Sequence, residues 1–124
     1  REPFEKGAMV GWWIDECLVV VPSDDWAPLV DRTFGTMSVL DDEARELSRF
    51  IIAGAFTHDL DKQGRIPLTA ELREHAGITG SKVRLIGVGE YLEIWDPARL
   101  SERFATLRRE GVSNHAKRLA ARVA

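Results

Sequence analysis

The eight residues Asp61–Leu68 read Asp-Lys-Gln-Gly-Arg-Ile-Pro-Leu, and the interpretation of the whole fold begins with them. Asp61 can accept backbone N–H bonds across a tight turn or pair with Arg65 four residues later. Gly64 allows the positive φ angle that such turns often need. A guanidinium held in one orientation suits phosphate groups and guanine edges. The stretch therefore predicts a polar turn that leads into an apolar strand. A hairpin corner with a surface ion pair is the alternative use of the same residues.

Short apolar runs alternate with helical patterns and with turn residues along the rest of the chain. Pro28 is tolerated only in the first turn of a helix, Asp96-Pro97 is a strong start signal, and Gly77 and Gly111 are stop signals. The expected elements are strands 9–13 and 17–21, a helix from Asp24 or Asp25, a helix over 42–53, a strand over 55–60 continued by Ile66 and Leu68, a helix over 70–76, strands 82–87 and 91–95, and a helix from Pro97 to Gly111. Residues 112–124 are expected to form either a short helix or a disordered basic arm.

The composition limits the class of protein. With 124 residues and 44% hydrophobic side chains, the chain can form one ordinary core or two small intertwined ones. Cys17 is the single cysteine, so an internal disulfide is impossible and a reducing cytoplasm is the expected compartment. Because Cys17 lies in an apolar run, we expect a buried side chain and not a nucleophile. No apolar stretch approaches 18 residues, so we expect no membrane span.

The formal charge of −3 is mild evidence against nucleic-acid binding, but the charge is unevenly distributed. Residues 97–124 hold seven basic and two acidic side chains, which leaves ten basic and eighteen acidic in residues 1–96. Many of the acidic side chains lie in residues 15–46. A ring of subunits can present repeated basic turns on one surface while the acidic parts face elsewhere, and many weak contacts then add up.

Few residues suit catalysis or metal binding. His58, His75 and His115 have no spacing typical of metal ligands. Alternation along a strand places His58 and Asp59 on opposite faces, so a surface histidine is the expectation. The run Gly87–Leu92 lacks the third glycine of a dinucleotide-binding fingerprint and precedes a strand, which indicates a hairpin turn. We therefore expect a protein that is not an enzyme, with no cofactor and no small-molecule substrate.

The aromatic side chains are not interleaved with basic ones, so base stacking is not their expected role. Packing in the core or between subunits is expected for Trp12, Trp13, Trp26, Trp95, Phe50, Phe56 and Phe104.

A weak internal repeat relates the two halves of the chain. Arg1-Glu2 matches Arg73-Glu74 at an offset of 72, and Leu18–Pro22 lies over Leu92–Asp96 at an offset of 74. Counting back 72 positions from Asp61 places the corresponding turn of the first half before residue 1. We therefore expect at least a dozen residues of the natural N-terminus, with one polar turn, to be absent from this sequence.

Four stretches of the second half form a recognisable pattern: Ala53-Gly54-Ala55, the Asp-x-x-x-Arg turn within 59–66, Ala70-Glu71-Leu72-Arg73 and Ile86–Asp96. Together they resemble the second repeat of the MraZ family, and the resemblance extends over nearly the whole chain, from Arg1 to about Gly111. The resemblance implies an α+β, β-rich fold of two pseudo-repeated swapped-hairpin units with flanking helices, of the SpoVT–AbrB or double-split β-barrel type. Residues 1–54 would be the remainder of the first repeat with linking helices, 55–111 the second repeat with its C-terminal helix, and 112–124 a basic tail.

The resemblance also implies a DNA-binding transcriptional regulator of a bacterial division and cell-wall gene cluster. It would be cytoplasmic, associated with the nucleoid, and assembled as a ring-shaped homo-oligomer on double-stranded promoter DNA. The implied DNA-binding residues are Asp61, Lys62, Gln63, Gly64, Arg65, Arg73 and Arg84. For Arg73 and Arg84 a contact with a neighbouring subunit is the alternative. An oligomeric protein-interaction scaffold without intrinsic DNA binding is the alternative function.

Overall fold

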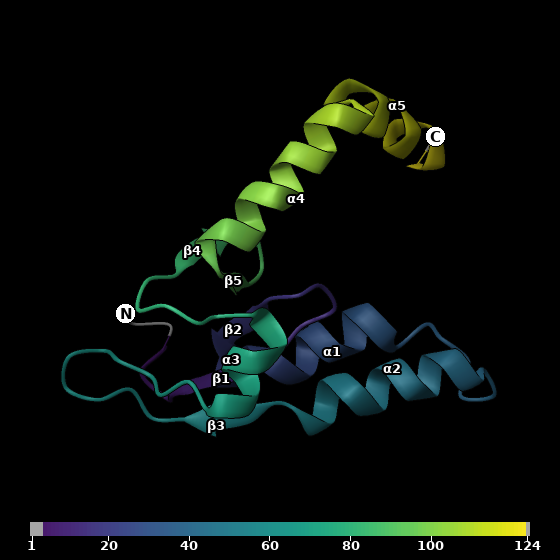
Figure 1. The fold of residues 1–124 in the computed structure, drawn as a ribbon. Helices are drawn as coiled ribbons and strands as arrows, with labels where there is room; N and C mark the ends of the chain where they lie inside the picture. The colour runs from purple at the N-terminus through teal and green to yellow at the C-terminus, as the bar shows by residue number, and fades with distance from the viewer. Residues whose placement is uncertain (1–3, 124) are drawn as a thin grey trace.

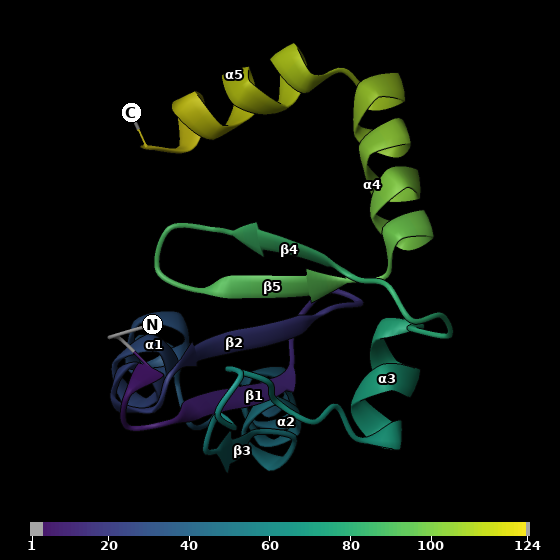
Figure 2. The same cartoon turned by 90° about the vertical axis from the view of Figure 1, so that its left-hand side faces the viewer.

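The computed structural model describes residues 4–123, in which five strands form one antiparallel sheet with α-helices on both of its faces (Figure 1). The elements are β1 (Ala8–Trp12), β2 (Leu18–Pro22), the 3-10 helix η2 (Ser23–Asp25), α1 (Trp26–Phe34), α2 (Asp42–Ala53), β3 (Phe56–His58), α3 (Ala70–Ala76), β4 (Arg84–Gly87), β5 (Leu92–Trp95), α4 (Pro97–Glu110) and α5 (Val112–Val123). The strand order is β3-β1-β2-β5-β4, with β3 and β4 at opposite edges (Figure 2). The predicted α+β class is confirmed.

Strand β2 is the centre of the sheet, and both of its faces are buried. Leu18 and Val20 point to one face and Val19 and Val21 to the other, and all four are at most 5% exposed. β2 pairs with β1 on one side and with β5 on the other. A continuous apolar run is what a strand covered on both faces requires. This one strand therefore joins the β1–β2 and β4–β5 hairpins into a single sheet.

Each face of the sheet carries its own hydrophobic core. Helix α3 covers one face with Leu72 and Ala76, which are fully buried. Helices α1, α2 and α4 contribute Leu29, Ile51 and Leu100 to the core on the other face. The short α3 is thus fixed to the sheet by its own apolar side, and the segment before it is held at that end.

Capping residues set the helix boundaries where the sequence predicts them. The side chains of Asp41, Thr69 and Asp96 each accept a hydrogen bond from the backbone N–H three residues later, at the start of α2, α3 and α4. Gly77 ends α3 with a φ of 66°, a left-handed conformation that glycine adopts without strain. The predicted helices over 42–53 and 70–76 are confirmed at both ends. Pro28 lies in the first turn of α1, also as predicted.

Three predictions about strands need correction. The first hairpin uses 8–12 and 18–22, one residue away from the predicted ranges at each strand. The strand predicted over 55–60 covers only Phe56–His58. Ile66 and Leu68 do not continue it: the segment 59–69 has no strand, and both side chains pack against the core beneath α3. Pro67 between them has no backbone N–H for a strand ladder.

The tryptophans pack as predicted, but three phenylalanines do not enter the core. Trp13 and Trp95 are buried, and Trp12 and Trp26 pack against the same core. The side chains of Phe50, Phe56 and Phe104 are between 41% and 48% exposed in the single chain. Of the two predicted uses, the core of the single chain is excluded for these three side chains, and their packing between subunits stays a prediction.

The structure also tests the predictions of a buried Cys17 and of a chain without a membrane-spanning helix. Cys17 is fully buried, and its burial raises the pKa of the thiol, so it behaves as a small hydrophobic side chain. Within residues 4–123, no helix has the length and apolar character that crossing a membrane requires.

The C-terminal segment is an ordered helix over the range of α5, which decides between the two predicted forms. The match of Arg1-Glu2 to Arg73-Glu74 cannot be followed, because residues 1–3 lie outside the described part of the chain, as does residue 124. The repeat, the swapped hairpins and the domain boundaries at 54 and 111 stay predictions.

A substitution at Gly54 tests the packing that joins the sheet to α2. The φ of Gly54 is −92°, an ordinary value, but a Cβ at this position would overlap the Trp12 indole, which stacks on Phe50. We expect Gly54→Ala to lower the free energy of unfolding by about 1–3 kcal/mol, the usual cost of overpacking. Chemical denaturation of both proteins measures this.

The matched control is Gly80→Ala, because nothing lies within 4 Å of a Cβ at Gly80. Equal losses of stability in the two variants would contradict the packing described for Trp12.

Candidate nucleic-acid interface

The predicted polar turn exists and is organised by one carboxylate. Asp61 Oδ1 accepts hydrogen bonds from the backbone N–H groups of Gln63 (2.9 Å) and Arg65 (2.8 Å). Its other oxygen, Oδ2, accepts from Arg65 Nε at 2.7 Å. The two uses that the sequence left open, backbone capping and an ion pair with Arg65, therefore occur together. Both carboxylate oxygens of Asp61 therefore hold Arg65, one through its backbone and one through its side chain.

The backbone closes the same turn. The Gly64 N–H donates to the Asp61 carbonyl at 2.9 Å, and the Asp61 N–H donates to the Arg65 carbonyl at 3.2 Å. Gly64 has a φ of 76°, which confirms the expected positive angle. A side chain with a Cβ would strain the backbone at this position. The five residues thus form a compact turn held by hydrogen bonds within itself.

The hydrogen bonds to Asp61 also lower the pKa of its carboxyl. The backbone N–H of Arg65 is the largest cause, the Arg65 side chain is the second, and the backbone N–H of Gln63 adds to both. All three donors favour the ionised form. The carboxylate therefore stays charged over the whole neutral range and keeps the Arg65 guanidinium oriented.

The turn presents its cations to solvent. The Arg65 side chain is 74% exposed although it is paired, and Lys62 and Gln63 are exposed beside it. Arg65 uses Nε for Asp61, and within residues 4–123 its two terminal nitrogens make no hydrogen bond. The segment between β3 and α3 extends beyond the sheet at the left of Figure 1. The guanidinium thus has one edge fixed and the other free for a ligand.

Both ends of the projecting segment are anchored. At its start, β3 pairs with β1, with His58 opposite Ala8. At its end, Ile66 and Leu68 pack into the core beneath α3, and the Thr69 hydroxyl caps that helix. These contacts hold the turn relative to the sheet, while the exposed tip carries the charge.

Arg73 and Arg84 lie on other elements than the turn, on α3 and β4. Arg73 Nη2 donates to the Gly80 carbonyl at 2.9 Å, so this half-buried arginine holds the loop after α3. Arg84 is exposed on β4, at the sheet edge opposite β3. Four strand spacings of about 4.8 Å separate those edges. A role for either arginine in binding DNA, or in pairing with a neighbouring subunit, stays a prediction.

A hollow of about 480 Å³ beside the turn was not predicted. It is lined by Phe4, Glu5, Gly7, Asp59, Leu60, Asp61 and Gly64. The pairing of Ala8 with His58 places the segment before β1 next to the segment after β3. The missing Cβ of Gly7 permits this close approach, because a Cβ there would lie 2.8 Å from the His58 carbonyl oxygen. Such long-range pairing leaves no local signal in the sequence.

The histidine expectation is corrected in one respect. His58 is half-buried and not a surface residue, and its Nε2 is buried without a hydrogen-bond partner among the described residues. No cluster of three or more His, Cys, Asp or Glu residues within 4–123 has an arrangement that holds a metal ion.

Residues 51–123 match the model of a family described as "MraZ protein, putative antitoxin-like". The chain is 37% identical to the transcriptional regulator MraZ of Thermomicrobium roseum, over 91% of this chain and 78% of that protein. It is 42% identical to the protein of the same name from Desulfitobacterium hafniense, over 68% of this chain and 58% of that protein. With the one from Nocardioides sp. it shares 39% identity, over 82% of this chain and 69% of the relative.

The acid titration of Asp61 tests the geometry of the turn. Since the pKa of the folded state lies below the ordinary 3.8, the ionised carboxylate stabilises the turn. That stabilisation is complete above pH 3.8 and is lost as the pH falls through the lowered pKa. We expect carboxyl-carbon NMR to give an Asp61 midpoint below the one measured for the urea-unfolded chain.

In Arg65→Ala the midpoint should rise but remain below 3.8, because the backbone N–H of residue 65 still donates to Oδ1. A folded-state midpoint at 3.8 or higher in the unmodified protein would contradict the described hydrogen bonds.

Proposed function

The chain belongs to the MraZ family, and from that premise we propose that it is a DNA-binding transcriptional regulator. The observation that carries the proposal is the Asp61–Arg65 turn, in which a carboxylate fixes an exposed guanidinium at the tip of an anchored segment. The names of the relatives, which are transcriptional regulators, support the same class of function. The site is therefore one for binding and not for catalysis.

Each residue of the turn has a role in this proposal. Arg65 contacts a base edge or a phosphate through its terminal nitrogens, and Asp61 orients it. Lys62 meets phosphate as a flexible point charge, and the Gln63 amide can both donate to and accept from a base edge. Gly64 provides the positive φ that lets the turn close so tightly.

A single turn offers few contacts, so affinity must come from repetition. In the proposal a ring-shaped homo-oligomer places copies of the turn at regular spacing along repeated promoter sites. The regulated genes are those of a bacterial division and cell-wall cluster, with the protein in the cytoplasm at the nucleoid. Linked weak contacts bind far more tightly than one alone, provided that their geometry matches the DNA. Repetition also explains how a chain with a formal charge of −3 can bind a polyanion.

The substitution Arg65→Ala tests the proposal directly. We expect it to weaken binding to direct-repeat promoter DNA by about 1–3 kcal/mol, or roughly fivefold to 150-fold in Kd, the loss typical of one good contact. Fluorescence anisotropy with labelled duplex DNA at fixed salt measures the affinity. Binding by the unmodified protein should also fall steeply as salt is added.

Arg32→Ala is the matched control. Arg32 is an exposed arginine that pairs with Glu90 at 2.8 Å, but it lies on α1, away from the turn. Equal affinity for Arg65→Ala and the unmodified protein would remove Arg65 from the interface. Affinity that does not respond to salt would favour the scaffold function instead.

A further inference from the structure

Helix α5 has an apolar stripe that nothing in the described chain covers. Val112, Leu119 and Val123 recur at helical spacing on one side of the helix and are 54%, 59% and 82% exposed. Helix α4 extends away from the sheet, and α5 turns off at its far end (Figures 1 and 2). Apolar side chains exposed together on one side of a helix are typical of interaction surfaces.

The same helix is purely basic in its charged residues. It carries Lys117, Arg118 and Arg122 and no acid. Arg118 and Arg122 lie along one flank of the stripe, one turn apart. The surface that covers α5 must therefore be apolar in the middle and acidic at its rim.

Helix α2 has such a surface at the other end of the molecule. A hollow of about 410 Å³ is lined by Leu47 and Phe50 and by three acids, Asp42, Glu43 and Glu46. The Phe50 side chain is 45% exposed there although it stacks on Trp12. No basic residue lines this hollow.

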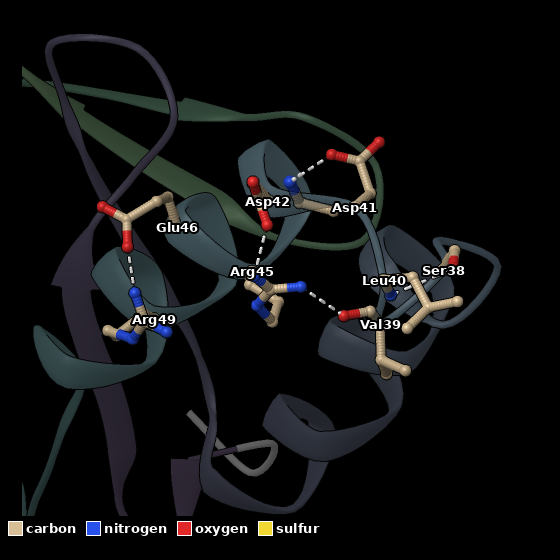
Figure 3. A network of polar contacts seen from close by, with 9 residues as sticks. Ser38, Val39, Leu40, Asp41, Asp42, Arg45, Glu46 and Arg49 are labelled. Atoms are coloured by element: carbon tan, nitrogen blue, oxygen red, sulfur yellow. Dashed lines mark hydrogen bonds and ion pairs between the residues drawn. The ribbon is translucent and has the colours of Figure 1, made fainter.

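Polar contacts order the α2 surface in advance (Figure 3). Arg45 pairs with Asp42 and donates Nη1 to the Val39 carbonyl at 2.7 Å, and Arg49 pairs with Glu46. The bond from Arg45 to Val39 ties the loop before α2 to the helix, and the apolar Val39 and Leu40 of this loop are exposed. Glu43 has no ion-pair partner among residues 4–123 and is free to meet a cation.

A second hollow, of about 550 Å³ between α4 and the β4–β5 hairpin, is less suitable for α5. Its lining includes Arg103 as well as Glu93 and Glu110, and His115 of α5 itself belongs to it. Charge therefore does not favour a basic helix there as it does on α2.

We propose that the apolar stripe of α5 in one copy of the chain docks on the α2 hollow of the next copy, with Arg118 beside Glu43. Within one chain the two surfaces lie at opposite ends, with the sheet between them, so they cannot meet (Figures 1 and 2). Because the two surfaces differ, each copy can bind one neighbour on each side, and such contacts close into a ring when the rotation permits. The inference rests on the self-association in the proposed function and identifies the surface that would produce it.

Light scattering coupled to size-exclusion chromatography tests this interface on the whole chain. We expect the unmodified protein to elute as an assembly of several 13.9 kDa chains, and Leu119→Glu to elute as the monomer. Ala121→Glu is the matched control, because Ala121 lies on the side of α5 opposite the stripe and should leave the assembly unchanged. A monomeric unmodified protein, or an assembly that survives Leu119→Glu, would overturn the inference.

A charge exchange identifies the partner surface. Arg118→Glu and Glu43→Arg should each lower the mass of the assembly at a given concentration, and the double variant should restore it. No restoration, with both single variants folded by circular dichroism, would place α5 on another surface and would overturn the inference.

DNA binding separates this test from that of the proposed function. Leu119→Glu leaves the turn intact, so isolated duplex sites should still bind, with the repeated promoter losing its advantage over a single site. If Arg65→Ala leaves the affinity unchanged while Leu119→Glu dissociates the assembly, then the proposed function fails and the interface remains.

Discussion

Burial of β2 on both faces is the constraint on which the rest of the structure depends. The strand pairs with β1 and β5, and its side chains alternate between two separate cores. A polar residue anywhere in Leu18–Val21 would enter one core or the other, because neither face of this strand reaches solvent. Through β2 the two hairpins share one sheet, so that β3 with its polar turn lies at one edge and β4 at the other.

The turn itself depends little on the cores. A surface ion pair between exposed side chains contributes little free energy, so the Asp61–Arg65 pair alone would not fix a guanidinium. The backbone donors make the difference: Asp61 Oδ1 accepts from two N–H groups whose positions the chain dictates, and Oδ2 is then aimed at Arg65 Nε. Charge-assisted bonds to backbone N–H groups need no long side chain to be ordered. The orientation of Arg65 is thus a property of five consecutive residues.

That local character explains what the sequence could predict. The turn, the cap at Asp96 and the stop at Gly77 depend on neighbours a few residues away, and all three were predicted correctly. The path of Ile66 and Leu68 was not predicted correctly. An apolar side chain beside a proline fits a strand or a packed loop equally well until the partner surface is known.

The exposed apolar surface of α5 could not be predicted for the same reason. The stripe of α5 was present in the spacing of Val112, Leu119 and Val123, and a periodicity test would have predicted its helix. The exposure of this stripe follows from where α4 directs α5, and no local pattern encodes that direction.

The central claim is that the Asp61–Arg65 turn is the surface that meets DNA. The most direct measurement is a titration of the isotope-labelled protein with duplex promoter DNA, followed by NMR of the arginine Nε–H and backbone amide signals. The account predicts that the largest changes occur at Arg65 Nε–H and at the amides of residues 62–65, while the signals of α2 change little. Changes confined to α5, with the Arg65 signals unmoved at saturating DNA, would contradict it.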